Sequence, residues 1–137
     1  MSNRALAWLC GAALVVSACG PPSPHRVELP LYTEAFAMRI SWSELHAREP
    51  ITVRLVVRDK KTGEPIENGE GRVFANNADG IRTFDSFVPT AESGTYTATL
   101  SFITAGEWAL GVQFRRDSLS KLERPEDLRL SVGAERQ

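Results

Sequence analysis

The chain of 137 residues is poor in the residue types that bind transition metals or act as strong nucleophiles. It has two cysteines, two histidines and two methionines. Both cysteines, Cys10 and Cys19, lie among the first 19 residues. The rest of the chain therefore has no thiol, which excludes a disulfide scaffold, a cysteine metal site and thiol catalysis there. The net charge of −1 excludes the strongly basic surface of nucleic-acid-binding domains, so we expect no nucleic acid partner.

The sequence also has no apolar run long enough to cross a bilayer, which takes about 20 residues. Its longest apolar stretch, residues 5–16, follows Arg4 and has the length of the hydrophobic region of a secretory signal peptide. The segment that ends it, Val16-Ser17-Ala18-Cys19, resembles the bacterial lipobox, in which the peptide is cut before the cysteine and that cysteine is lipidated. An ordinary signal peptide cleaved near Ala18 is the alternative.

The lipobox predicts that residues 1–18 are a lipoprotein signal peptide and that Cys19 carries acyl chains. Two or more chains are enough for stable membrane anchoring. Residues 19–30 contain several prolines, including Pro21, Pro22 and Pro24, and are expected to form a tether that holds the domain off the membrane. Gly20 after the cysteine, in place of aspartate, resembles lipoproteins of the outer membrane. We therefore expect a cell-envelope location, at the outer membrane and facing the periplasm.

Residues 31–137 alternate apolar and polar side chains in short runs, which is typical of half-buried β-strands. The two clearest runs, residues 95–102 and 106–114, are separated by a short turn, and we expect them to pair as the centre of an antiparallel sheet. Further runs lie at residues 27–32, 35–42, 51–58, 71–75, 81–88 and 127–132. Turn signals separate them, and no stretch has a convincing helical pattern. The pattern predicts one all-β domain, an immunoglobulin-like antiparallel β-sandwich of about seven or eight strands.

The large side chains on the apolar faces of these runs are expected to form the structural core: Trp42, Tyr96, Leu100, Phe102, Trp108, Leu110, Val112 and Phe114. Tyr96 follows Glu92-Ser-Gly-Thr at the start of a run and resembles the tyrosine corner of immunoglobulin-like domains, in which the hydroxyl bonds to upstream backbone. Ala98 stands where antibody domains have a cysteine, which excludes the antibody branch.

A wider pattern resembles small bacterial envelope domains of the YtkA-like and FixH-like family. It consists of Gly63-Glu-Pro-Ile66 after a strand, Gly94-x-Tyr96 and Gly106-x-Trp108-x-Leu110-x-Val112. The resemblance covers roughly residues 35–114 and implies an immunoglobulin-like module. Membrane-anchored members of that group are associated with respiratory oxidase assembly and copper handling. This chain departs from them in having a lipobox instead of a membrane helix, and in lacking a run rich in methionine and histidine.

The available metal ligands are His25 in the tether, His46 in a polar loop and Met38 among core residues. No two of them have a chelating spacing, so we expect no metal and no cofactor. Asn77, Asp79 and Gly80 resemble the middle of a calcium loop. However, the loop's acidic first ligand and its glutamate at position twelve are missing, so a hairpin turn is expected there.

Catalysis has little support in the residue pattern. A serine near His46 would be the only nucleophile and base, and no nucleophile-elbow sequence is present. Glu64, Glu67 and Glu70 fit a solvated loop, so we expect no enzyme activity. Five arginines on predicted strands form a basic patch only if the sheet order brings some of them together: Arg39, Arg54, Arg58, Arg72 and Arg82. The alternative is an ordinary exposed sheet face.

These observations favour a lipid-anchored envelope lipoprotein whose non-catalytic domain binds another envelope protein, through an edge strand or through the loops at one end of the sandwich. Two alternatives stay open. The family resemblance implies an accessory factor in copper delivery or oxidase assembly. A structural lipoprotein of a secretion or surface apparatus would also fit a lipid-anchored β-sandwich.

Overall fold

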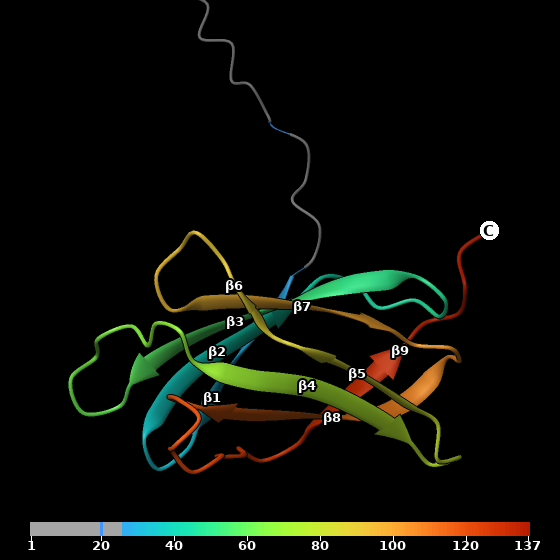
Figure 1. Cartoon of the computed structure of the whole chain (residues 1–137). Helices are drawn as coiled ribbons and strands as arrows, with labels where there is room; N and C mark the ends of the chain where they lie inside the picture. The colour runs from blue at the N-terminus through green and yellow to red at the C-terminus, as the bar shows by residue number, and fades with distance from the viewer. Residues whose placement is uncertain (1–19, 21–25) are drawn as a thin grey trace, which may run out of the picture.

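The computed structural model describes Gly20 and residues 26–137, which form a two-layer β-sandwich (Figure 1). The expected lipidation site at Cys19, the signal peptide and His25 lie outside the described residues. Nine strands follow in chain order: β1 (Val27–Tyr32), β2 (Phe36–Trp42), β3 (Pro50–Asp59), β4 (Glu70–Asn77), β5 (Arg82–Ser86), β6 (Val88–Pro89), β7 (Thr95–Ser101), β8 (Gly106–Arg115) and β9 (Leu128–Val132). No helix in the described part of the chain could cross a membrane.

The strands form one sheet in the order β1-β2-β3-β7-β6 and a second in the order β5-β4-β8-β9. Every pair of neighbours is antiparallel. The all-β sandwich expected from the alternation is therefore confirmed. β1 pairs with β2 along its whole length, so the sheet begins at Val27, within the segment expected to be tether. Pro30 lies in this edge strand, where a residue without an N–H is tolerated.

The described residues form nine strands, one more than the upper number expected, because the run at residues 81–88 is divided between the two sheets. β5 pairs with β4 in the four-stranded sheet, whereas β6 pairs with β7 in the other. Phe87 lies between them and is buried in the core. The chain crosses the sandwich at this residue, since burying its ring interrupts the strand, and Pro89 then ends the short second part.

The expected hairpin of residues 95–102 and 106–114 is wrong. β7 lies between β3 and β6, and β8 lies between β4 and β9, so the two strands belong to opposite sheets. Their apolar faces meet across the sandwich instead: Phe102 packs edge-on against Trp108 at 5.1 Å between ring centroids, and Tyr96 against Phe114 at 5.2 Å. Alternation predicted correctly which face of each strand is apolar, but it does not specify the strand's partner.

The core lies between the two sheets and contains all eight large residues expected there, of which Trp42, at 5 % exposed, is the least buried. The Trp108 indole Nε1 donates to the Thr104 carbonyl at 3.0 Å, so the buried N–H keeps a hydrogen-bond partner. Packing among aromatic rings from both sheets stabilises the described domain without any disulfide.

Candidate recognition site

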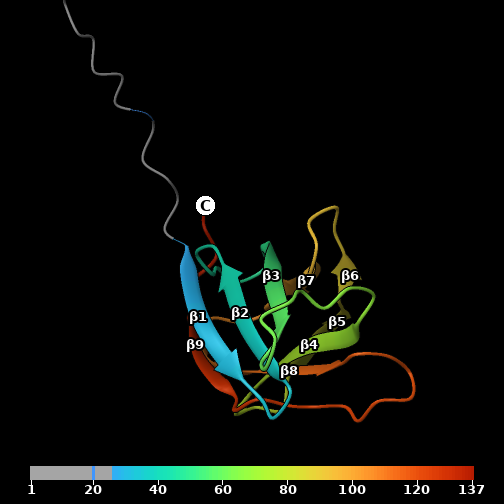
Figure 2. The same cartoon turned by 90° about the vertical axis from the view of Figure 1, so that its left-hand side faces the viewer.

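The sandwich has two distinct ends, and its two longest connections, β3–β4 and β8–β9, lie at the end away from the start of β1. Val27 pairs with Trp42, and Pro50 at the start of β3 pairs with Ser101 at the end of β7, which defines one end. The C-terminal residues lie at this same end, where Ala47 donates to the Gly133 carbonyl at 2.9 Å. The β3–β4, β6–β7 and β8–β9 connections lie at the opposite end (Figures 1 and 2). We call these three connections the loop end.

A hydrogen-bonded carboxylate joins two of these connections. Asp59 Oδ1, at the end of β3, accepts the backbone N–H groups of Lys61 at 2.8 Å and Thr62 at 3.0 Å. Its Oδ2 accepts from Arg116 Nη2, at the start of the β8–β9 connection, at 2.6 Å. The N–H groups of Thr62 and Lys61, with the Arg116 guanidinium, hold the pKa of Asp59 below its usual range. The loop end is thus tied together across the two sheets.

The β8–β9 connection exposes two leucines to solvent, Leu119 and Leu122, and Leu119 is the more exposed of the two. Asp117 Oδ1 accepts from the Ser120 hydroxyl at 2.8 Å and from the Leu119 N–H at 2.9 Å, and these bonds lower the pKa of Asp117. Leu119, inside this turn, is 97 % exposed. Farther along, Glu123 Oε1 accepts the Ala35 N–H at 2.9 Å, which attaches the connection to the start of β2. The turn is thus ordered by hydrogen bonds and holds Leu119 in solvent.

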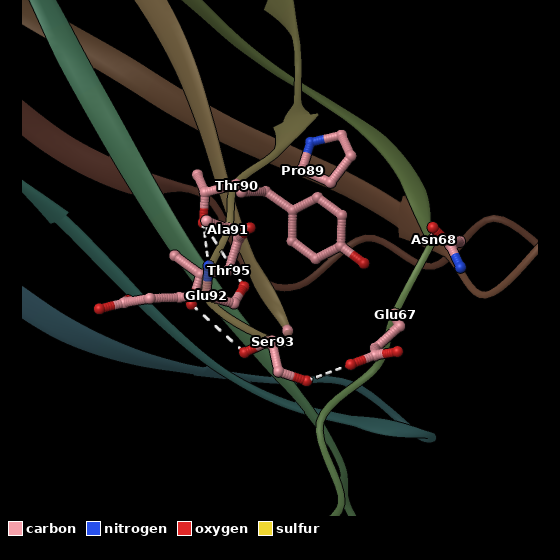
Figure 3. Close-up of a pocket in the computed structure, with 10 residues that line it drawn as sticks. Glu67, Asn68, Pro89, Thr90, Ala91, Glu92, Ser93 and Thr95 are labelled. Carbon is pink, nitrogen blue, oxygen red and sulfur yellow. Dashed lines mark hydrogen bonds between the residues drawn. The ribbon is translucent and has the colours of Figure 1, made fainter.

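A small hollow of about 230 Å³ lies between the β3–β4 and β6–β7 connections (Figure 3). Ser93 donates to Glu67 across it, and the Thr90 hydroxyl accepts the Glu92 N–H at 3.2 Å. Glu92 also pairs with Arg54 on the outer face of β3. These bonds close the connections on themselves, so the carboxylates of Glu67 and Glu92 at the rim of the hollow already have partners within the domain.

Tyr96 forms the floor of this region, with a different geometry from the tyrosine corner of immunoglobulin domains. Its hydroxyl donates to the Ile66 carbonyl at 2.6 Å and accepts the Gly69 N–H at 2.9 Å. The partners therefore lie in the β3–β4 connection, about thirty residues upstream, and not a few residues away as in the antibody corner. Burial raises the pKa of Tyr96, so the phenol stays neutral and structural.

The residues weighed as metal ligands do not come together in the described part of the chain. Met38 is only 1 % exposed in the core, as its alternation with Phe36 and Ile40 predicts. His46 lies in the β2–β3 connection, where its Nδ1 is 3.0 Å from the Ala134 carbonyl and its Nε2 has no hydrogen-bond partner. Glu44 Oε1 is 3.5 Å from that Nε2. Among the described residues, no three His, Cys, Asp or Glu side chains form a group that could hold a metal ion.

The segment that resembles a calcium loop is the hairpin turn between β4 and β5. Asn77 Oδ1 accepts the N–H groups of Asp79 at 3.1 Å and Ile81 at 3.0 Å. Gly80 has a φ of +79°, a conformation that favours glycine. The side-chain oxygen of Asn77 is thus used within the turn itself.

The five strand arginines do not form one patch. Arg39, Arg54 and Arg58 lie on the five-stranded sheet, and Arg72 and Arg82 lie on the other. On the first sheet each arginine has a local acceptor: Arg39 is 3.4 Å from Glu28, Arg54 pairs with Glu92, and Arg58 donates to the Gly63 carbonyl at 3.1 Å. These three arginines therefore belong to an ordinary exposed sheet face and not to a basic patch.

Sequence reasoning missed Leu119 and Phe84, the most exposed of the large apolar side chains. Leu119 lies in the stretch between the last two alternating runs, which is otherwise mostly polar, and the leucines at 119 and 122 were the signal for an exposed apolar side chain. Phe84 lies in an alternating run, which indicates a strand face but cannot tell the core side from the solvent side.

No family model matches the chain, and no curated protein matches it. Two solved structures resemble it in fold. One is a copper-bound variant of FetP from uropathogenic Escherichia coli, with a TM-score of 0.53, 11 % identity, and coverage of 79 % of this chain and 97 % of that chain. The other is FetP as isolated after expression in the periplasm of E. coli, with a TM-score of 0.51, 12 % identity, and coverage of 79 % and 95 %. These likenesses show the fold. Membership of the YtkA-like and FixH-like family stays a prediction.

Proposed function

We propose that this protein is a lipid-anchored lipoprotein of the cell envelope whose immunoglobulin-like domain binds another envelope protein without catalysing a reaction. The observation that carries the proposal is that the two ends of the domain differ. The chain enters the sheet at Val27, and the joined connections with the exposed Leu119 lie at the opposite end. An anchor at Cys19, in the outer membrane and facing the periplasm, would point this loop end away from the bilayer.

The reach of the chain supports such an arrangement. The eight residues from Cys19 to Val27 span at most about 29 Å when fully extended. The ten residues of β3 add about 33 Å along the sandwich. The loop end can therefore lie several tens of ångströms from the membrane surface, where it can meet the periplasmic part of a partner.

Site-specific photo-cross-linking of the full-length protein in cells tests the proposal. The cross-linking residue replaces Leu119, or, as a matched control, Ile103, which is 57 % exposed in the β7–β8 connection at the other end. We expect a discrete adduct from position 119 that is absent from position 103. Leu119→Asp should abolish co-purification of that partner without changing membrane attachment. The same adducts from both positions, or none from position 119, would contradict binding through the loop end.

A second candidate function is an accessory role in copper delivery or respiratory oxidase assembly. The fold likeness to the copper-bound FetP variant favours it, and so does the unpartnered Nε2 of His46. A ring whose Nδ1 faces a carbonyl presents its other nitrogen as a ligand. The described residues do not supply a complete site, because Met38 is enclosed in the core and Glu44 is the one carboxylate beside the ring.

Copper binding separates the two candidates. Titration of the full-length protein with Cu(I) against a competing chelator should give tight one-to-one binding under the copper hypothesis. That binding should be lost in His46→Gln or His25→Gln and kept in Asp79→Asn. Weak binding that none of these changes alters would leave the protein-recognition hypothesis in place and remove the copper one.

A further inference from the structure

Two phenylalanine rings lie on the solvent side of the four-stranded sheet. Phe74 on β4 is directly opposite Phe84 on β5, and opposed residues of an antiparallel pair share a face. The neighbouring Val73 and Ala75 point into the core, so the two rings point away from it. Phe84 is 71 % exposed and lies on the edge strand of its sheet. Phe74 beside it is half-buried, and adjoining apolar side chains of this kind mark an interaction surface more often than an isolated apolar residue does.

The Phe74 ring is held in a defined position from both sides. On β8, Gly111 is its cross-strand neighbour, and a methyl group there would overlap the ring. The Arg124 guanidinium lies 4.7 Å from the ring centroid, within cation–π range. Asp127 holds that guanidinium through both carboxylate oxygens, at 3.0 Å and 2.8 Å from Nη2. The aromatic surface is therefore built before any partner arrives.

Arginines surround the two rings. Arg72 lies 5.9 Å from the Phe74 ring centroid, and its Nε donates to the Gln113 side chain at 3.0 Å. Arg82 begins β5 two residues before Phe84, so its side chain lies on the same face of the sheet. A hollow of about 370 Å³ lies over this area. We call it the arginine–phenylalanine platform, and it comprises Arg72, Phe74, Arg82, Phe84, Gln113 and Arg124.

The platform carries a net positive charge although the whole chain carries −1. Arg124 is neutralised by Asp127, whereas among the described residues no salt bridge engages Arg72 or Arg82. The nearby Asp85 alternates with Phe84 along β5 and points toward the other sheet, where its Oδ2 accepts the Thr99 N–H, so it forms no ion pair with either arginine. A second copy of this face would place arginines against arginines, which disfavours self-association. The charge fits a partner that is acidic.

We propose that the platform binds an acidic segment of a partner protein, with an aromatic or aliphatic side chain against Phe84 and carboxylates on Arg72 and Arg82. Arginine next to an exposed ring suits such a segment, because it pairs with carboxylates in a bidentate fashion and its neighbouring ring buries apolar area. This proposal rests on the proposed function, since both require a protein partner. The platform is a different surface from Leu119, so binding at the platform and binding at the loop end can be tested and rejected separately.

A labelled peptide serves as the probe. Fluorescence anisotropy measures binding of Asp-Glu-Phe-Asp-Glu-Val-Asp-Glu to the full-length lipidated protein in non-ionic detergent. Two control peptides replace the acidic residues by lysine, or the Phe and Val by serine. We expect binding of the first peptide only, weakening as salt is raised because exposed charges are screened.

Variants locate the binding. Arg82→Glu and Phe84→Ser should each weaken binding by about tenfold or more, as central contacts of small interfaces do. Arg39→Glu, an exposed strand arginine on the opposite sheet, should leave it unchanged. Thermal melting of each variant shows that it is folded, and Arg72→Gln replaces any variant that is not.

Equal binding of the lysine peptide, no binding of the acidic one, or affinity unaffected by both platform variants would overturn the proposal. Equal binding of the serine peptide or of anionic phosphatidylglycerol vesicles would show a general anion surface, and this too would overturn it. Loss of the Leu119 cross-link with peptide binding intact would reject the loop end alone.

Discussion

At the scale of single residues, the same side-chain type has different roles according to what surrounds it. Tyr96 is buried and joins β7 to the β3–β4 connection through two hydrogen bonds, whereas Tyr32 is 63 % exposed on the edge strand β1. Asp59 accepts two backbone N–H groups and one arginine, and so it orders a loop. Local sequence can indicate the two backbone partners of Asp59 in its own turn, but not Arg116 or the partners of Tyr96, which are far away along the chain.

Removing the Tyr96 hydroxyl should destabilise the domain. Tyr96→Phe leaves the Ile66 carbonyl and the Gly69 N–H without their partner, and an unsatisfied buried polar group costs about 1–3 kcal/mol. Urea unfolding measures the loss. Tyr32→Phe is the matched control and should change the free energy of unfolding by no more than about 0.5 kcal/mol. Equal effects of the two substitutions would show that the Tyr96 bonds do not contribute.

The charge of Asp59 should stabilise the protein in a pH-dependent way. Its folded pKa lies below the ordinary value of 3.8 because of the Thr62 and Lys61 N–H groups and Arg116. This contribution is fully present above pH 3.8 and is lost as the pH falls through the lower pKa of the folded state. The substitution Asp59→Asn keeps the size of the side chain and removes its charge.

Melting temperatures of the native protein and Asp59→Asn, measured from pH 7 to pH 2, check this. The difference should be constant from pH 7 to about pH 5 and should shrink below pH 3.8. Asp79→Asn, on the β4–β5 turn, is the control. A difference that persists unchanged at pH 2, or that grows on acidification, would contradict the assignment.

At the scale of elements, the crossing at Phe87 protects an open strand edge. β6 covers β7 only at Thr97 and Tyr96, so the part of β7 beyond it has no strand neighbour on that side. Asp85 on β5 lies against this part and accepts the Thr99 N–H at 2.8 Å. A charged side chain at an open edge is a known means of preventing edge-to-edge association.

Asp85→Ala should therefore lower stability and promote self-association. The lost hydrogen bond should cost about 1 kcal/mol, and the exposed Thr99 N–H should pair with other chains as the concentration rises. Urea unfolding and light scattering at two protein concentrations measure the two effects. Asp79→Ala should produce neither. A monomeric Asp85→Ala with unchanged stability would show that the edge is protected by other means.

At the scale of the whole molecule, the sandwich has an end where the chain enters and an opposite end with its two longest connections, β3–β4 and β8–β9. The arginine–phenylalanine platform lies at neither end, but on the outer face of the four-stranded sheet. An anchor before Val27 would make this geometry functional, since it would set which end faces the bilayer. The anchor itself is a prediction from the lipobox at Cys19.

Cys19→Ser should release the protein from membranes, because the acyl chains attach to that thiol. Each buried methylene contributes about 0.8 kcal/mol, so losing the chains removes the attachment. Fractionation of cells, followed by detection of the protein, measures the change. Cys10→Ser makes the same chemical change within the expected signal peptide and should leave the protein membrane-bound. Membrane attachment of Cys19→Ser would contradict the lipobox interpretation.

The sequence by itself determined which residues are strands, which faces are apolar and where the turns lie. These follow from local rules: side chains alternate across a strand, and residue types such as Asn77 and Gly80 favour tight turns. The large core residues from Trp42 to Phe114 were predictable for the same reason. The sequence also shows that there is no cysteine beyond Cys19, so the domain has no disulfide and its stability must come from packing.

Only the tertiary structure decided which strands are neighbours and hence where any site lies. β7 and β8 adjoin in the chain but lie in opposite sheets, and their apolar faces pack against each other across the core. The Arg124 guanidinium reaches Phe74 across fifty residues, and Asp59 reaches Arg116 across fifty-seven. Such contacts depend on how the layers pack, and alternation along one strand carries no information about them.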